Sequence, residues 1–501
     1  MALWEDIAIP SVETVTFGEL QGKLVQASGP NDASLEDYAR RDGMFYPHII
    51  VPYTYQRHEK GAIPPIRNRK VLARNLESDD SDNSDLERAG AHSLAQIGSN
   101  IYLYLDSFIL PTIRSLIGET LGYYQGLSDS LNQSPVRALA WHPYKQLFAI
   151  AHRENSIHLF DLTNGVWIPE SNTGLTHEAQ YEVTCMEWNP HSGMLLAVAV
   201  RGGVLLWKIG NCHSADDESA EPSRASKRKS HTCEFLSAPG LEYVSTLTWS
   251  SDGRYLVAGS GAKDLIVIWD TLGLERDFDG KPVPIYLRKF RGQCTKVLKW
   301  SPDGNYLLQI CGSSILRIWE THTWECVNIN LTSPAQSAAW MPDSKTIIFA
   351  LQGSHSIFNI KLNRDPPSLD IRDLKPQRLP RRSAPILPGR EMVTVGGPIK
   401  SLAVDPKGRR LIVIFDHEEL GSELLALLSI EEKPLPQFTP IGLIRGPHWQ
   451  PGTLQPQADA GLSNRVLPEA VSVQFAAQFT SGALASIVWK NGKIGFLPCS
   501  F

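Results

Sequence analysis

A short run ending in tryptophan recurs five times in this 501-residue chain, and no other feature constrains the fold as strongly. The five tryptophans that end these runs are Trp141, Trp188, Trp249, Trp300 and Trp340. A second aromatic residue follows each of them after 18 to 20 residues: Phe160, Trp207, Trp269, Trp319 and Phe358. So regular a spacing indicates an internal repeat, and a repeat restricts the fold to a small set of architectures.

Each repeat has the pattern of strand, turn, strand, turn and strand. In the fourth copy, Ser301–Gly304 is a Ser-Pro-Asp-Gly turn, followed by the apolar runs Tyr306–Ile310 and Ile315–Trp319. Pro fixes φ and Gly permits the reversal, while β-branched and aromatic residues favour extended backbone. Strands that are apolar on both sides are expected where one sheet lies between two others. With a period of 40 to 61 residues, this pattern predicts β-propeller blades.

Two weaker copies complete the array. Val404 stands where the tryptophan is expected in one copy, and Phe475 in the other. We therefore predict an all-β chain whose residues 131–501 form a seven-bladed WD40-type β-propeller. A sandwich of unrelated strands is the alternative, but it does not explain the paired aromatic spacing. The predicted blades lie near residues 136–163, 183–210, 244–271, 296–320, 336–362, 399–430 and 471–498.

Eight tryptophans occupy the two recurring positions, and we predict that they pack between blades: Trp141, Trp188, Trp207, Trp249, Trp269, Trp300, Trp319 and Trp340. Two segments are expected to be loop insertions, at 211–240 and 364–398. The first contains Lys227–Lys229, which is either a weak nuclear-import patch or part of a solvated loop.

The N-terminal extension divides into three parts. Residues 1–60 contain a predicted hairpin that would give the last blade its closing strand. Residues 61–92 form an acidic linker, expected to be disordered, in which Ser84 is a candidate phosphorylation site. Residues 93–130 carry apolar side chains at helical spacing, so we expect an amphipathic helical segment that docks on this propeller or on a partner.

Composition excludes several classes of function. There are 48 basic and 53 acidic side chains, so the chain has no general affinity for nucleic acid and would meet a membrane only indirectly. Seven cysteines without a C-x-x-C pair predict a reducing compartment. The chain has no P-loop, no H-E-x-x-H and no G-x-S-x-G motif. We therefore expect no enzyme activity, catalytic residue, cofactor, metal or small-molecule substrate.

Several short motifs resemble the aladin family of WD-repeat nucleoporins. These motifs are Leu205–Trp207, Ile268–Asp270, Phe290–Gly292, Trp319–Cys326 and Gly442–Gly446. The resemblance extends from about Val136 to Phe501, and Trp269–Asp270 is the only Trp-Asp pair. It implies a non-catalytic scaffold of the nuclear pore complex at the nuclear envelope. Its expected partners are other nucleoporins, above all a transmembrane nucleoporin that anchors it, and its expected role is in nucleocytoplasmic transport.

A WD40 adaptor in another complex is the alternative function. Such an adaptor would be a substrate receptor of a ubiquitin ligase or a chromatin-associated reader, since propellers serve many unrelated roles. Residues on the rim follow no internal repeat, so the sequence assigns no partner-binding residue.

Overall fold

The chain divides into two units, and the structure describes only the first, Met1–Pro52 with Leu131–Phe501. The computed structural model describes residues 7–11, 13–29, 32–41, 43–51, 135–163, 166–169, 174–210, 231–277, 280–288, 294–362, 371–379, 382–386, 391–416, 421–431, 436–446 and 469–501. The linker 61–92 with Ser84, the helical segment 93–130 and Lys227–Lys229 lie outside these residues.

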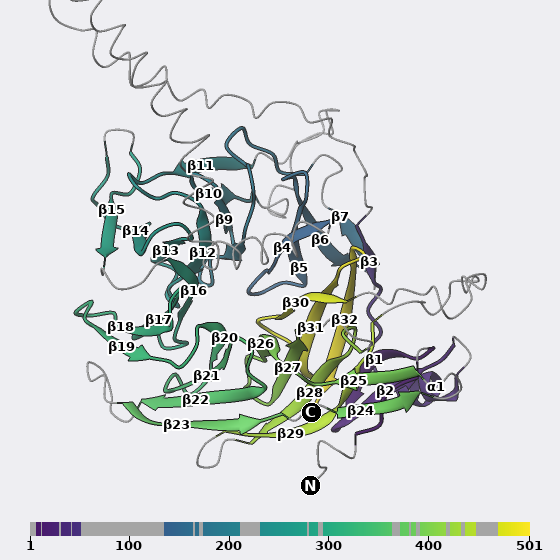
Figure 1. The fold of residues 1–501 in the computed structure, drawn as a ribbon. Helices are drawn as coiled ribbons and strands as arrows, with labels where there is room; N and C mark the ends of the chain where they lie inside the picture. The colour runs from purple at the N-terminus through teal and green to yellow at the C-terminus, as the bar shows by residue number, and fades with distance from the viewer. Residues whose placement is uncertain are drawn as a thin grey trace, which may run out of the picture. The chain divides into compact units, whose positions relative to one another are not determined.

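Seven sheets contain the blades, and within each blade neighbouring strands are antiparallel and follow one another in chain order (Figure 1). The strands of blades one and two are β4 (Val136–Trp141), β5 (Leu147–His152), β6 (Ile157–Thr163), β7 (Val166–Pro169), β8 (Met186–Trp188), β9 (Leu195–Val200), β10 (Gly203–Lys208) and β11 (Thr232–Leu236). Those of blades three and four are β12 (Val244–Trp249), β13 (Tyr255–Ser260), β14 (Leu265–Asp270), β15 (Pro284–Arg288), β16 (Thr295–Trp300), β17 (Tyr306–Cys311), β18 (Ile315–Glu320) and β19 (Cys326–Asn330).

The remaining strands form blades five to seven and one separate hairpin. Those of blades five and six are β20 (Ala335–Trp340), β21 (Thr346–Leu351), β22 (Ser356–Leu362), β23 (Ile371–Arg378), β26 (Ile399–Val404), β27 (Arg410–Phe415), β28 (Leu425–Glu431) and β29 (Gln437–Ile444). Blade seven contains β30 (Ala470–Phe475), β31 (Gly482–Trp489) and β32 (Lys493–Ser500). The separate hairpin is β24 (Arg382–Ile386) with β25 (Glu391–Val395).

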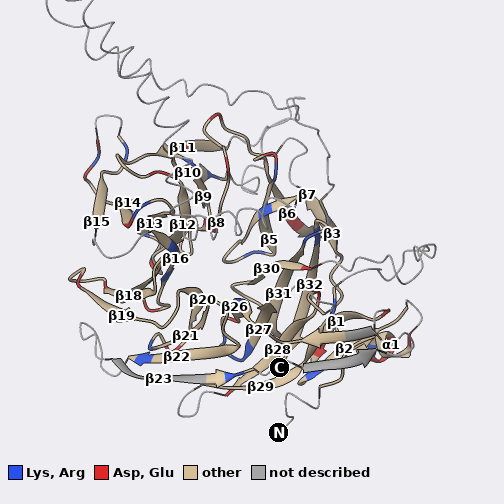
Figure 2. Cartoon of the chain, viewed as in Figure 1, with Lys and Arg blue, Asp and Glu red and all other residues tan. Residues whose placement is uncertain are grey.

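The blades follow one another in a ring. The first strand of each blade contacts the first strand of the next, and β30 of blade seven contacts β4 of blade one. The prediction of a seven-bladed β-propeller is therefore confirmed. Lys and Arg are interspersed with Asp and Glu over the blades, as the near balance of charge requires (Figure 2).

The hydrophobic core is divided among the blade junctions. Seven clusters of buried side chains each join two neighbouring blades. In β17, Leu307 belongs to the cluster shared with blade three, while Leu308 belongs to the cluster shared with blade five. Successive side chains of a strand point to opposite faces, so a strand between two neighbouring blades is mostly apolar on both faces.

The N-terminal segment lies against the outer edge of blade seven. Strand β1 (Val15–Leu20) pairs in parallel with β32, and β2 (Lys23–Ala27) pairs with β1. The short strand β3 (Ile49–Ile50) pairs antiparallel with β32. These strands cover an edge that would otherwise expose unpaired backbone groups.

The expectation of two loop insertions is corrected by the strands that they contain. Strand β11 lies within 211–240 and is the outer strand of blade two. Strands β23, β24 and β25 lie within 364–398. The prolines obscured these strands, yet Pro376 is in the outer strand β23, where a missing N–H costs no ladder bond.

A short helix, α1 (Ala33–Arg40), also went unpredicted. Asp32 caps it, because its side chain accepts a hydrogen bond from the backbone N–H of Ser34 at 3.1 Å. The helix buries Leu35 and Tyr38. Eight residues are too few for a clear helical period in the sequence.

Candidate functional site

The tryptophans at the first recurring position link neighbouring blades by hydrogen bonds. Trp188 donates from its indole Nε1 to the carbonyl of Ala140 in blade one, at 3.1 Å. Trp249 donates to the carbonyl of Glu187 at 3.2 Å, and Trp340 to that of Lys299 at 3.0 Å. Each acceptor is the residue directly before the tryptophan of the previous blade, so the same hydrogen bond recurs at these three junctions.

Two junctions depart from this pattern. At the closing junction, Trp141 donates to the Ser486 hydroxyl at 2.9 Å, and that hydroxyl donates to the carbonyl of Gln474 at 3.1 Å. A serine therefore relays the bond to the equivalent carbonyl. In the described part of the chain, the buried Nε1 of Trp300 has no hydrogen-bond partner. Its ring instead packs edge-on against Trp324 at 6.1 Å.

At the second recurring position, the tryptophans are buried near the outer strands. Trp207 donates to the side-chain oxygen of Gln180 at 3.2 Å, and Trp319 to that of Gln309 at 3.0 Å. Trp269 is 1% exposed and packs between blades two and three. All eight tryptophans named from the sequence thus lie within or beside the inter-blade clusters.

Polar side chains close the turns of each blade. In blade four, the Ser301 hydroxyl donates to Asp303 and accepts the backbone N–H of Tyr306 at 2.9 Å. Gly304 has a φ of 80°, a left-handed conformation that favours glycine. The first turn, between the first and second strands, is thus fixed by its own side chains.

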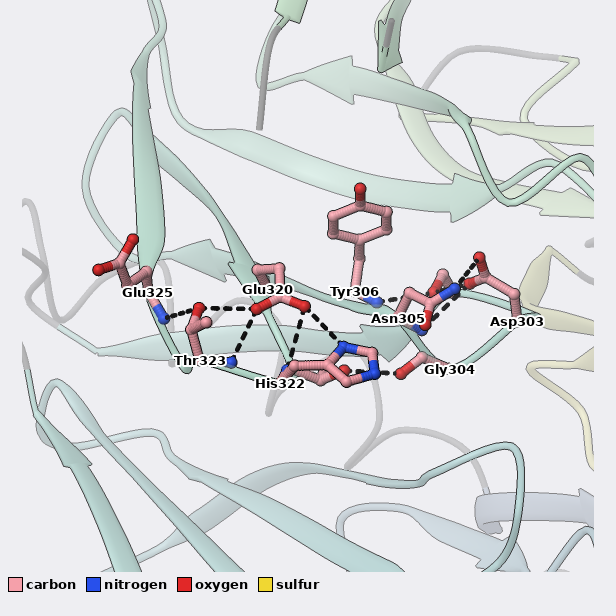
Figure 3. A network of polar contacts seen from close by, with 10 residues as sticks. Asp303, Gly304, Asn305, Tyr306, Glu320, His322, Thr323 and Glu325 are labelled. Carbon is pink, nitrogen blue, oxygen red and sulfur yellow. Dashed lines mark hydrogen bonds and ion pairs between the residues drawn. The ribbon is translucent and has the colours of Figure 1, made fainter. Parts of the chain in front are cut away.

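Glu320 organises the third turn of blade four, between the third and fourth strands. Its carboxylate accepts the backbone N–H and the hydroxyl of Thr323, at 2.8 and 2.6 Å, and lies 2.7 Å from His322 Nδ1 (Figure 3). Burial opposes ionisation of this carboxyl, but the hydrogen bonds from Thr323 and His322 outweigh it, so the pKa of Glu320 is lowered. The turn also holds Trp324 at a φ of 56°.

Buried ion pairs were not anticipated from the sequence. Arg317 in β18 donates to Asp264 of blade three at 2.8 Å, across a junction. Glu19 of β1 is fully buried and accepts Nε of Arg410 in blade six at 2.7 Å. A charged residue inside an apolar run, such as Arg317 in Ile315–Trp319, is the signal that was available. Its partner could not be found, because Asp264 lies in a turn of another repeat.

A second buried pair holds the N-terminal segment to blade six. Arg445 donates to Glu423 at 2.7 Å and to the carbonyl of Pro10 at 3.1 Å. Burial lowers the pKa of Arg445, while Glu423 acts in the opposite direction. Thr16 and Arg445 also exchange two hydrogen bonds.

No metal cluster or catalytic constellation emerges among these residues. Within the described ranges, no group of three His, Cys, Asp or Glu side chains could hold a metal ion. The same ranges contain no helix with the length and apolar character needed to cross a membrane.

Seven repeated blades, five of them with a tryptophan at the end of the first strand, define a WD-repeat propeller. The family model described as "Aladin seven-bladed propeller" matches residues 125–500, so the chain belongs to the aladin propeller family, a WD-repeat scaffold type. Over 382 residues the chain is 28% identical to Aladin of Arabidopsis thaliana, covering 74% of this chain and 77% of that protein.

Two further relatives match shorter stretches. The F-box-like/WD repeat-containing protein TBL1X of Mus musculus is 25% identical over 166 residues, which is 33% of this chain and 28% of that protein. The WD repeat-containing protein slp1 of Schizosaccharomyces pombe is 24% identical over 233 residues, covering 45% of this chain and 40% of that protein.

Proposed function

We propose that this chain is a non-catalytic scaffold subunit of the nuclear pore complex. In this proposal it is a nucleoporin at the nuclear envelope, anchored through a transmembrane nucleoporin and supporting nucleocytoplasmic transport. The observation that carries the proposal is membership of the aladin family across residues 125–500. The fold supports it, because seven interlocked blades present turns from fixed positions. A net charge of −5 favours protein partners over the passing RNA.

Localisation in living cells tests this function directly. With the chain tagged at its own locus, we expect a continuous signal at the nuclear rim. Depletion of the anchoring transmembrane nucleoporin should disperse that signal, while depletion of an unrelated inner-membrane protein should leave it in place. A diffuse cytosolic signal in untreated cells contradicts the proposal.

A WD-repeat adaptor of another complex is the second candidate function. The partial similarity to an F-box-like/WD repeat-containing protein favours it, although only 33% of this chain is covered. Affinity purification with mass spectrometry separates the two candidates. Recovery of pore proteins supports the scaffold, whereas a stable complex with ligase or histone components and no pore proteins supports the adaptor.

A further inference from the structure

The first turn of blade six differs in charge from the corresponding turns of its neighbours. Three residues after the last residue of the first strand, blades three, four and five carry Asp252, Asp303 and Asp343, whereas blade six carries Lys407. Asp405 closes this turn instead, by accepting the backbone N–H groups of Lys407, Arg409 and Arg410. The turn therefore exposes a cation where blades three, four and five have a carboxylate.

Arg409 also lacks the ion-pair partner that the equivalent arginine of blade three has. In blade three, Arg254 occupies the same turn position and pairs with Asp270 at 2.7 Å. Asp270 lies opposite Tyr255 in its sheet, whereas the residue opposite Arg410 in blade six is Ser429. In the described part of the chain, neither Lys407 nor Arg409 forms an ion pair.

These two cations gather around one aromatic ring. Nζ of Lys407 lies 5.8 Å and Cζ of Arg409 lies 5.6 Å from the ring centroid of Phe501. Arg410 lies closer, at 4.4 Å, but Glu19 neutralises it. Two cations with no ion-pair partner in the described part of the chain thus lie beside one aromatic ring.

An apolar pocket adjoins Lys407. It has a volume of about 240 Å³ and lies between the first turns of blades six and seven. The blade-seven turn, 476–481, contains no acidic residue. The pocket is lined by Pro406, Lys407, Ala476, Ala477, Gln478, Phe479, Thr480 and Gly482. Lys407 donates to the carbonyl of Phe479 at 3.3 Å, which holds the cation beside the pocket.

We propose that this pocket is a docking site for an acidic peptide segment of a partner protein. One apolar side chain of the peptide enters the pocket, and flanking carboxylates pair with Lys407 and Arg409. The charge is complementary, since both cations lack a carboxylate partner among the described residues. A single small apolar pocket suits a peptide better than a nucleic acid, which requires a longer basic track. The inference rests on the proposed scaffold function and adds to it the chemistry of one partner.

A defined peptide tests the site on the full chain. The probe is a fluorescein-labelled twelve-residue peptide with a central Phe, two Asp on each side and a Gly/Ser background, measured by fluorescence polarisation. Lys407→Glu should weaken its binding about tenfold or more, because reversal replaces attraction by repulsion. Ala477→Phe should weaken it similarly by filling the pocket, and Ala477 is exposed, so the core need not adjust.

The control is Lys145→Glu, which makes the same charge change in the first turn of blade one, where Lys145 is exposed. It should leave the affinity within about twofold, since long-range charge alone contributes little at ordinary salt. Peptides with Phe→Ala or with every Asp→Asn should also bind weakly. Melting temperatures close to wild type establish that the variants are folded.

Three results would each overturn the inference. The first is that the wild-type chain shows no saturable peptide binding, and the second is that Lys145→Glu and Lys407→Glu weaken peptide binding equally. The third is that a twelve-nucleotide oligouridylate competes fully with the peptide. The proposed function is judged separately by localisation. Failure of peptide binding with an intact rim signal rejects only this docking site, whereas peptide binding with a diffuse cytosolic signal rejects only the pore assignment.

Discussion

Blades one to five and the junction of blades six and seven are held together by different means. In the first region, the repeat supplies an indole at each junction, and most of these indoles donate to the neighbouring blade. In the second region, Val404 and Phe475 replace the indoles. Strand β1, the buried ion pair of Arg410 with Glu19 and the hydrogen bond from Arg445 to the Pro10 carbonyl make the connection there. One ring thus combines short contacts that repeat from blade to blade with a long-range connection. We call this connection, made by strand β1 and the Glu19–Arg410 ion pair, the clasp.

The two kinds of contact differ in how far apart their partners lie in the sequence. Trp188 and Ala140 are 48 residues apart, whereas Arg410 and Glu19 are 391 residues apart. A contact within adjacent repeats can form as soon as both repeats exist. The Glu19–Arg410 contact must bring together segments far apart in the sequence, so it carries a larger loop-closure cost.

The largest expected effect comes from breaking the clasp. Arg410→Met leaves the fully buried Glu19 carboxylate without its partner, which should lower the free energy of unfolding by about 3 to 5 kcal/mol. Urea denaturation followed by tryptophan fluorescence measures this change. The matched control is Arg254→Met, which removes an exposed ion pair and should cost about 1 kcal/mol or less. Equal losses in the two variants would show that the clasp is no stronger than a surface pair.

Removing an indole from the repeated region should have the next largest effect. Trp300→Ala removes a ring packed on the cluster between blades three and four and should cost about 3 kcal/mol, near the lower limit for a large buried aromatic. The lower limit applies because this ring is only partly buried. The change is measured by thermal unfolding. A melting temperature equal to that of wild type would contradict its placement between the blades.

A paired substitution separates packing from hydrogen bonding at the same position. Trp249→Phe loses the bond to the carbonyl of Glu187, whereas Trp300→Phe loses no such bond. The first should therefore be the more destabilising by about 1 kcal/mol, the usual net value of a hydrogen bond. The measurement compares the midpoints of urea denaturation of the two variants, with the same slope of unfolding free energy against urea concentration for both. If the order is reversed, the repeated indole bonds do not stabilise the ring.

Acid should weaken the contact between the N-terminal segment and blade seven near β3. Burial lowers the pKa of His48, which precedes β3, to about 4. The unfolded chain then binds more protons between pH 6.5 and 4, so stability is fully present above pH 6.5 and falls as the pH decreases. Between pH 7 and 5.5 the loss should be about 0.5 kcal/mol, after allowance for screening near the surface. His48→Gln should reduce the slope of melting temperature against pH, and an unchanged slope would exclude this histidine.

The repeat made much of the fold predictable. Strands of the first five blades follow the tryptophan spacing, because every blade must bury both of its faces against neighbours. Strand β23 was missed because its Pro376 reads as a loop signal, yet an outer strand tolerates it. Helix α1 was missed because a single short helix leaves no period to detect.

The candidate docking site was less accessible to prediction. Lys407 and Arg409 are visible in the sequence as ordinary turn cations. Their significance depends on Ser429 standing where Asp270 stands in blade three, and on Phe501 lying beneath them. Those relations come from strand register and from contacts between distant segments.

By itself, the sequence determined that the chain is a propeller of seven blades, with tryptophans at recurring positions. Local patterning suffices for this, because each blade has the same short-range solution to burying its strands. Only the tertiary structure decided how the ring closes and which charges remain unpaired. Glu19 meets Arg410, and Lys407 meets no carboxylate among the described residues, because register and ring closure bring remote segments together. The contact of Glu19 with Arg410 therefore depends on segments that are remote in the sequence, and no single repeat reveals it.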